Sequence, residues 1–75
     1  MEEQVLELLK REFPEIDFKA SDKMTEDGTL DSLAVTGIVA ALTLQFDVEI
    51  PYEEVTKENF NSLAAIVSLV EDLSE

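Results

Sequence analysis

The sequence predicts an all-α fold: a small bundle of three main helices plus one short helix, with a long loop between helices one and two. Apolar residues recur at helical spacing in three separate segments, and 75 residues leave room for a single domain. The chain contains no Cys and no His, so neither a disulfide nor a common zinc site can stabilise it. We therefore expect one domain over residues 1–75, in which helices pack on helices.

The first helix is predicted over residues 2–13. Glutamates stand near its start and Lys10 and Arg11 near its end, which is the arrangement that the helix dipole favours. Pro14 ends the helix, because the residue before a proline is pushed out of the helical region. The apolar face consists of Val5, Leu6, Leu8, Leu9 and Phe13.

Residues 14–31 show no sustained period and are rich in Pro, Ser, Asp and Gly, which favour turns and loops. A loop of this length is uncommon in a compact domain and is often functional. We expect four apolar side chains to anchor it on the bundle: Ile16, Phe18, Met24 and Leu30.

The second helix is predicted over residues 32–46, a stretch without any charged residue between Asp31 and Asp47. Either Asp31 or Ser32 serves as its N-cap. Gly37 weakens the interior of this helix by roughly 1 kcal/mol relative to Ala. The inward face is expected to consist of Ile38, Leu42 and Phe46, with Val35 and Val39 beside them.

The remaining chain predicts one minor and one main helix. After Pro51, the acidic stretch from 52 to 60 is long enough for one or two turns around Val55. The last helix begins near Asn61 or Ser62. Its apolar residues at helical spacing are Leu63, Ile66, Val67, Val70 and Leu73.

Eighteen acidic and five basic residues give a formal net charge of −13. Such a field repels nucleic-acid phosphates and anionic lipid surfaces, so we expect no nucleic-acid partner and no membrane insertion. No apolar run reaches the about 20 residues that a bilayer requires, and the start Met-Glu-Glu lacks the features of a secretory signal. We expect a cytoplasmic monomer whose partners are proteins with basic patches, although the charge alone can also serve to keep a small protein in solution.

The composition also restricts the chemistry of the chain. A Ser nucleophile normally needs an adjacent base, most often His, and a glycosidase-like carboxylate pair needs a cleft for which a chain of this size has little volume. The acidic loop fails the EF-hand pattern. Placing Gly28 at the invariant glycine puts Lys23 and Thr25 at ligand positions and Ala34 where the bidentate Glu belongs. We therefore expect neither catalytic activity nor a metal site.

Ser32 is the remaining candidate for chemistry, and from its position alone it would be a helix N-cap. Asp31-Ser32-Leu33 is followed by a helix, then by Phe46-Asp47-Val48-Glu49-Ile50-Pro51 and a short acidic segment. This order resembles the acyl carrier protein family over nearly the full chain. The tripeptide alone is a weak signal of this family, but the tripeptide at this distance from the second motif is a specific one.

The resemblance implies that a separate phosphopantetheinyl transferase attaches 4′-phosphopantetheine from coenzyme A to Ser32. The thiol of this arm would hold acyl intermediates of fatty-acid, polyketide or related biosynthesis as thioesters. It further implies that Asp31 helps to organise the serine and a magnesium ion in the transferase complex, and that Leu33 makes an apolar contact beside the arm. The other partners would be an acyl- or aminoacyl-loading ligase or synthase and downstream transferases.

Two departures from typical fatty-acid carriers keep other cargoes open. Thr29 and Leu30 replace the small residues that precede the motif, and a leucine there is similar to D-alanyl carrier proteins. Positions where fatty-acid carriers place acidic residues on helix two are uncharged here. One alternative is a D-alanyl or other aminoacyl carrier protein, and one of another class is an acidic helical interaction module without a prosthetic group. The uncharged positions are Ala34, Gly37, Thr43 and Leu44.

The helical period also predicts a partner-binding face. If the apolar face described above is buried, an uncharged strip lies on or near the outer side of helix two, unless the long loop covers it. Partners would bind this strip by burial, while Glu53, Glu54 and Glu58 steer their approach. The strip consists of Leu33, Ala34, Gly37, Ala40 and Leu44.

Overall fold

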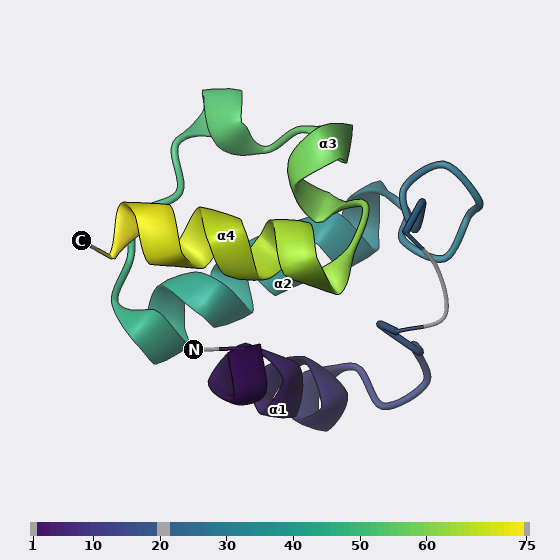
Figure 1. Ribbon diagram of the computed structural model, residues 1–75, viewed down its shortest axis with the longest axis horizontal. Helices are drawn as coiled ribbons and strands as arrows, with labels where there is room; N and C mark the ends of the chain where they lie inside the picture. Colours follow the sequence, from purple (N-terminus) through teal and green to yellow (C-terminus); the bar gives the residue numbers. More distant parts are fainter. Residues whose placement is uncertain (1, 20–21, 75) are drawn as a thin grey trace.

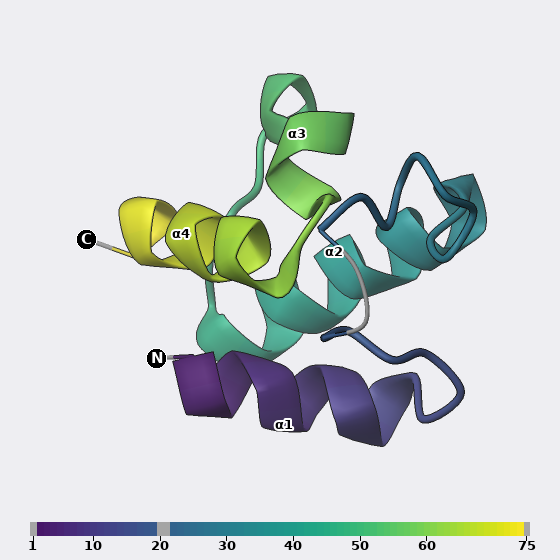
Figure 2. The ribbon, with the colours of Figure 1, turned by 45° about the vertical axis from the view of Figure 1, so that its right-hand side comes forward.

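A computed structural model describes residues 2–19 and 22–74 and confirms the all-helical class with a long loop between the first two helices. The described residues form α1 (Glu2–Glu12), α2 (Ser32–Phe46), a 3-10 turn η1 (Tyr52–Glu54), α3 (Lys57–Phe60) and α4 (Leu63–Leu73). The predicted bounds of α2 are confirmed. Helix α1 packs against α2 and α4, and α3 packs against α4. Figures 1 and 2 show α1 on one side of α4, and η1 and α3 on the other.

The core is built from apolar side chains of all four helices and of the loop, and no polar or charged residue is buried among the described residues. Apolar burial must therefore supply most of the stabilising free energy. The largest fully buried side chains are Phe60, Leu9, Met24, Ile38, Leu42, Ile66, Val5 and Val70.

The loop that follows α1 is anchored largely as its sequence predicts. Phe18, Met24 and Leu30 are buried, and Ile16 packs half-buried against the core. The ring of Phe18 meets that of Phe13 edge to face, with 6.5 Å between the centroids. The loop is therefore part of the core and not only a connection over its surface.

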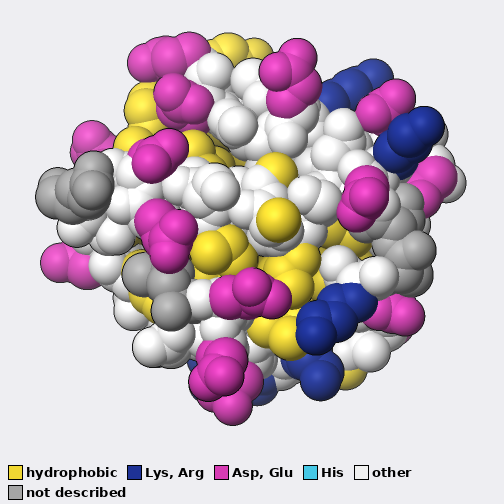
Figure 3. Space-filling model, viewed as in Figure 1, with side chains coloured by type: hydrophobic (Ala, Val, Ile, Leu, Met, Phe, Trp, Pro, Cys, Tyr) yellow, Lys and Arg dark blue, Asp and Glu magenta, His cyan; other side chains and the backbone are white. Residues whose placement is uncertain are grey.

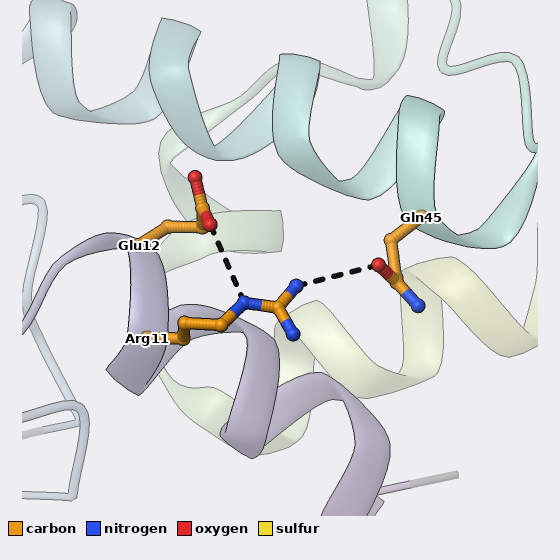
Figure 4. Close-up of polar contacts among 3 residues, drawn as sticks. All are labelled: Arg11, Glu12 and Gln45. Atoms are coloured by element: carbon orange, nitrogen blue, oxygen red, sulfur yellow. Dashed lines mark hydrogen bonds and ion pairs between the residues drawn. The ribbon is translucent and has the colours of Figure 1, made fainter.

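Helix α1 ends one residue earlier than predicted, at Glu12. Phe13 still donates its backbone N–H to the carbonyl oxygen of Leu9 at 2.8 Å, but Pro14 prevents the helix from continuing. Arg11 contacts the carboxylate of Glu12 at 3.4 Å and donates to the amide oxygen of Gln45 at 3.4 Å, as Figure 4 shows. The end of α1 is thus linked to the end of α2.

The short helix predicted within residues 52–60 is present, but it is not centred on Val55. It is α3, and Thr56 separates it from η1 and caps it through a hydrogen bond from the N–H of Asn59 at 3.2 Å. The buried residue of this segment is Phe60, whereas Val55 is half-buried. Phe46, predicted as a core residue, also lies half-buried at the edge, because it is the last residue of α2.

The two phenylalanines give a matched test of this core. Phe60→Ala is expected to lower the free energy of unfolding by about 3–5 kcal/mol, because a fully buried aromatic ring is removed. Phe46→Ala is expected to cost about half as much, since this side chain is already partly exposed in the folded state. Denaturant unfolding followed by circular dichroism measures both values, and equal losses would contradict the difference in burial.

The charged side chains of the surface are mostly carboxylates. Figure 3 shows Asp and Glu side chains scattered over one face, whereas the Lys and Arg side chains lie mostly toward its right-hand side. Even if every basic side chain formed an ion pair, the net excess of 13 negative charges would remain. The folded state therefore carries considerable self-repulsion at neutral pH.

Screening this repulsion should stabilise the protein. We expect the melting temperature to rise between low salt and about 0.15 M NaCl, where charges interact over about 8 Å only. At equal ionic strength, MgCl2 should raise it further than NaCl, because a divalent cation associates more strongly with neighbouring carboxylates. A melting temperature that is constant across the salt series would show that the carboxylates do not destabilise the fold.

Candidate functional site

Ser32 is the first residue of α2, and Asp31 is the residue that caps this helix. The backbone of Asp31 is extended, and its carboxylate accepts a hydrogen bond from the N–H of Ala34 at 2.8 Å. Of the two cap candidates, the structure thus selects Asp31. Ser32 is exposed, so its hydroxyl is accessible and is not required to cap the helix.

The start of α2 is favourable for a negatively charged group. The first turn of this 15-residue helix contains no acidic side chain, and its first backbone N–H groups have no partner within the helix. An anion attached at this end interacts favourably with the helix dipole, by about 0.3–1 kcal/mol. A phosphodiester on Ser32 therefore fits the local electrostatics.

An open hollow of about 570 Å³ adjoins Ser32. It lies between the loop and the start of α2 on one side and the segment from η1 to α3 on the other. Apolar and hydroxyl-bearing side chains both contribute to it, and Lys57 brings a positive charge. The lining residues are Thr25, Leu30, Asp31, Ser32, Val35, Thr36, Tyr52, Val55, Thr56 and Lys57.

The loop reaches Ser32 through a closed turn. The N–H of Leu30 donates to the carbonyl oxygen of Met24 at 2.8 Å, and the Asp27 carboxylate accepts from the N–H and the hydroxyl of Thr29 at 3.0 and 2.7 Å. Gly28 has a φ of 90°, a conformation that residues with a side chain rarely adopt. Since Met24 and Leu30 are both buried, the turn holds the chain just before Asp31 in place.

The contact of Asn61 with this loop was not predicted from the sequence, although Asn61 makes four hydrogen bonds to it. Its side-chain oxygen accepts from the N–H and the hydroxyl of Thr25, and its amide nitrogen donates to the carboxylate of Glu26 at 2.9 Å. Its backbone oxygen accepts from the N–H of Met24 at 2.9 Å. The sequence signal for these contacts is absent, because 36 residues separate Thr25 from Asn61.

The predicted partner-binding strip on α2 is only partly exposed. Leu33 and Leu44 are 83% and 86% exposed, and Ala40 is exposed too, so the loop does not cover these three residues. Ala34 instead packs half-buried against the core. Gly37 was predicted on or near the outer side of α2 but is half-buried. A Cβ atom at this position would lie 3.1 Å from the ring of Phe13, so the lack of a side chain permits close packing of α2 against the end of α1.

The glutamates predicted to steer partners differ in their surroundings. Glu53 and Glu58 are exposed, whereas Glu54 is half-buried. The side-chain nitrogen of Asn59 donates to the backbone oxygen of Glu54 at 2.7 Å and to its carboxylate at 3.1 Å. Glu54 therefore also has a structural role in joining η1 to α3.

Two other kinds of site were searched for in residues 2–19 and 22–74. These residues contain no group of three or more Asp, Glu, His or Cys side chains placed to hold a metal ion. None of their helices has the length and apolar character needed to cross a membrane.

Comparison with known proteins identifies the class. The chain is 35% identical to the D-alanyl carrier proteins of Streptococcus pyogenes serotype M5 (strain Manfredo), serotype M49 (strain NZ131) and serotype M1, over 77 aligned positions. The alignments cover 97% of this chain and 94% of each relative. No protein-family model and no solved structure matches the chain. The chain belongs to the family of stand-alone carrier proteins of the acyl carrier protein type.

Proposed function

We propose that this protein carries an aminoacyl group, D-alanyl in the first instance, as a thioester on a 4′-phosphopantetheine arm attached to Ser32. It would have no catalytic activity of its own and would present its cargo to partner enzymes. The observation that carries the proposal is the exposed Ser32 at the start of α2, with Asp31 as cap, in a chain that is 35% identical to D-alanyl carrier proteins.

The residues around Ser32 fit the proposed arm. An accessible hydroxyl, a first helical turn that contains no acidic side chain beyond the cap Asp31, and an adjoining hollow occur together at this position. In the transfer, the Ser32 oxygen would form a bond to the phosphorus next to the pantetheine of coenzyme A, and the adenosine bisphosphate would leave as the serine proton is lost. The bound arm would supply the thiol that this chain lacks, since it contains no Cys.

Two observations favour an aminoacyl cargo over fatty-acid or polyketide intermediates. The relatives reported above are named D-alanyl carrier proteins. In addition, the exposed side of α2 carries no carboxylate, whereas typical fatty-acid carriers are acidic there. Leu30, which stands where those carriers have a small residue, is buried in the core of this protein.

Modification of Ser32 is tested by mass spectrometry of the intact protein. Incubation with coenzyme A and a broad-specificity phosphopantetheinyl transferase should add the mass of one phosphopantetheinyl group. Ser32→Ala should abolish this gain and change the free energy of unfolding by less than about 0.5 kcal/mol, because Asp31 and not Ser32 is the cap. A modified Ser32→Ala variant would refute the assignment, and an unmodified parent protein would favour an interaction module without a prosthetic group.

The cargo is tested on the modified protein with two loading enzymes. A D-alanine-adenylating ligase with ATP and D-alanine should produce a thioester, detected as a mass gain that hydroxylamine removes. An acyl-loading synthase of fatty-acid biosynthesis should load the protein poorly. The opposite preference would not affect the assignment of the arm to Ser32, but it would show that the cargo is an acyl group and not an aminoacyl group.

The exposed strip of Leu33, Ala40 and Leu44 is proposed as the partner-binding face, with the exposed Glu53 of η1 as a charge that steers the approach of the partner. Leu44→Glu should raise the KM of the loading ligase for this carrier about tenfold or more, because a charge would enter an apolar contact. Ser68→Glu, at an exposed position of α4, is the control and should leave KM unchanged. If Leu44→Glu has no effect while Glu53→Gln causes a large loss, the interface depends on charge and not on apolar burial.

A further inference from the structure

Asn61 connects the loop before Ser32 to the junction of α3 and α4. Its side chain uses both of its functional groups on this loop: the oxygen accepts from the N–H of Thr25 at 3.1 Å and from its hydroxyl, and the nitrogen donates to Glu26 at 2.9 Å. Its backbone oxygen accepts from the N–H of Met24 at 2.9 Å. Three consecutive loop residues are thus attached to a single residue that is distant in sequence.

A short series of residues connects Asn61 to Ser32. Met24 is fully buried, and its carbonyl oxygen accepts the N–H of Leu30 at 2.8 Å. Leu30 is buried as well and directly precedes Asp31, the cap of α2. A loop that detached from Asn61 would therefore release the chain immediately before the start of α2.

The same contacts determine the separation between the two sides of the hollow beside Ser32. Thr25 lines the hollow from the loop, and Lys57 lines it from α3. The hydroxyl of Thr25 faces the carbonyl oxygen of Lys57 at 3.3 Å as well as the side-chain oxygen of Asn61. The single proton of this hydroxyl is shared between the two acceptors, so it links the loop to Lys57 of α3 and to Asn61 directly after α3.

We propose that Asn61 is a positioning residue for the modification of Ser32. By fastening the loop to α3 and α4, it holds Asp31 and Ser32 in the orientation that the transferase must recognise. This proposal rests on the proposed function, since it assumes that Ser32 receives the arm. It assigns to Asn61 a role in the efficiency of the transfer beyond its contribution to stability, because small errors in the placement of a reacting group lower the rate strongly.

The hydrogen-bonding pattern of Asn61 allows the role to be tested by rescue. Asn61→Asp keeps an oxygen that can accept from Thr25 but loses the donor to Glu26, and it places two carboxylates together. Glu26→Gln in the same protein would supply a new donor from the opposite side. A residue needed only for packing would gain nothing from this second substitution.

The experiment measures kcat and KM of phosphopantetheinyl transfer from coenzyme A to six proteins at a temperature where circular dichroism shows all of them folded. The proteins are the parent, Asn61→Ala, Asn61→Asp, Asn61→Asp with Glu26→Gln, Asn59→Ala and Val67→Ala. Asn59 is the matched amide control, because its side chain contacts Glu54 and not the loop. Val67→Ala controls for stability, because it shortens a buried α4 side chain that forms none of the hydrogen bonds between Asn61 and the loop.

We expect kcat/KM to fall about tenfold in Asn61→Ala and in Asn61→Asp, and to return to within about twofold of the parent when Glu26→Gln is added. Asn59→Ala and Val67→Ala should stay near the parent value. Unchanged transfer in Asn61→Ala, or an equal loss in Val67→Ala, would overturn the positioning role while leaving Ser32 as the attachment site. Failure of the parent to take up the arm would instead overturn the proposed function, and the positioning role with it.

Discussion

The structure depends on one constraint: apolar burial must hold the fold together without help from disulfides or from His or Cys metal sites. The long loop therefore supplies core residues, and Phe18, Met24 and Leu30 are buried together with side chains from all four helices. This has a consequence for the site. Because Leu30 is fixed in the core, Asp31 and Ser32 directly after it have a defined position although both are exposed. The same residues that stabilise the fold thus also present the serine.

Elements whose signals are local in sequence could be predicted. The uncharged run between Asp31 and Asp47 gave the bounds of α2, and the spacing of apolar residues gave α4. Contacts between segments that are distant in sequence could not be predicted. The full burial of Phe60 at the end of the four-residue α3 has no periodic signal, and the contacts of Asn61 with the loop have none either. Gly37 was misplaced for the same reason, since its neighbour Phe13 lies on another segment.

The distribution of charge separates two surfaces. Carboxylates outnumber basic residues 18 to five in the sequence, yet α2 contains none, and its exposed Leu33 and Leu44 are apolar residues on the surface of an acidic protein. Long-range attraction to a basic partner and short-range contact can therefore involve different residues. In the proposed interface, charge would accelerate the encounter and suppress wrong partners, whereas burial of the apolar strip would contribute to the lifetime of the complex.

The core also bears on the kind of cargo. No polar residue is buried among the described residues, and the hollow beside Ser32 is open to solvent. A long acyl chain gains free energy by leaving water, and the open hollow would shield it only in part, through apolar lining residues such as Leu30, Val35 and Val55. An aminoacyl group is small, and its amine is largely protonated at neutral pH, so burial in an apolar core would be costly. An aminoacyl group that stays in water at the end of the arm needs no cavity, and the net charge of −13 attracts its cation at long range. The open surface beside Ser32 is therefore compatible with the small, charged cargo of the proposed function.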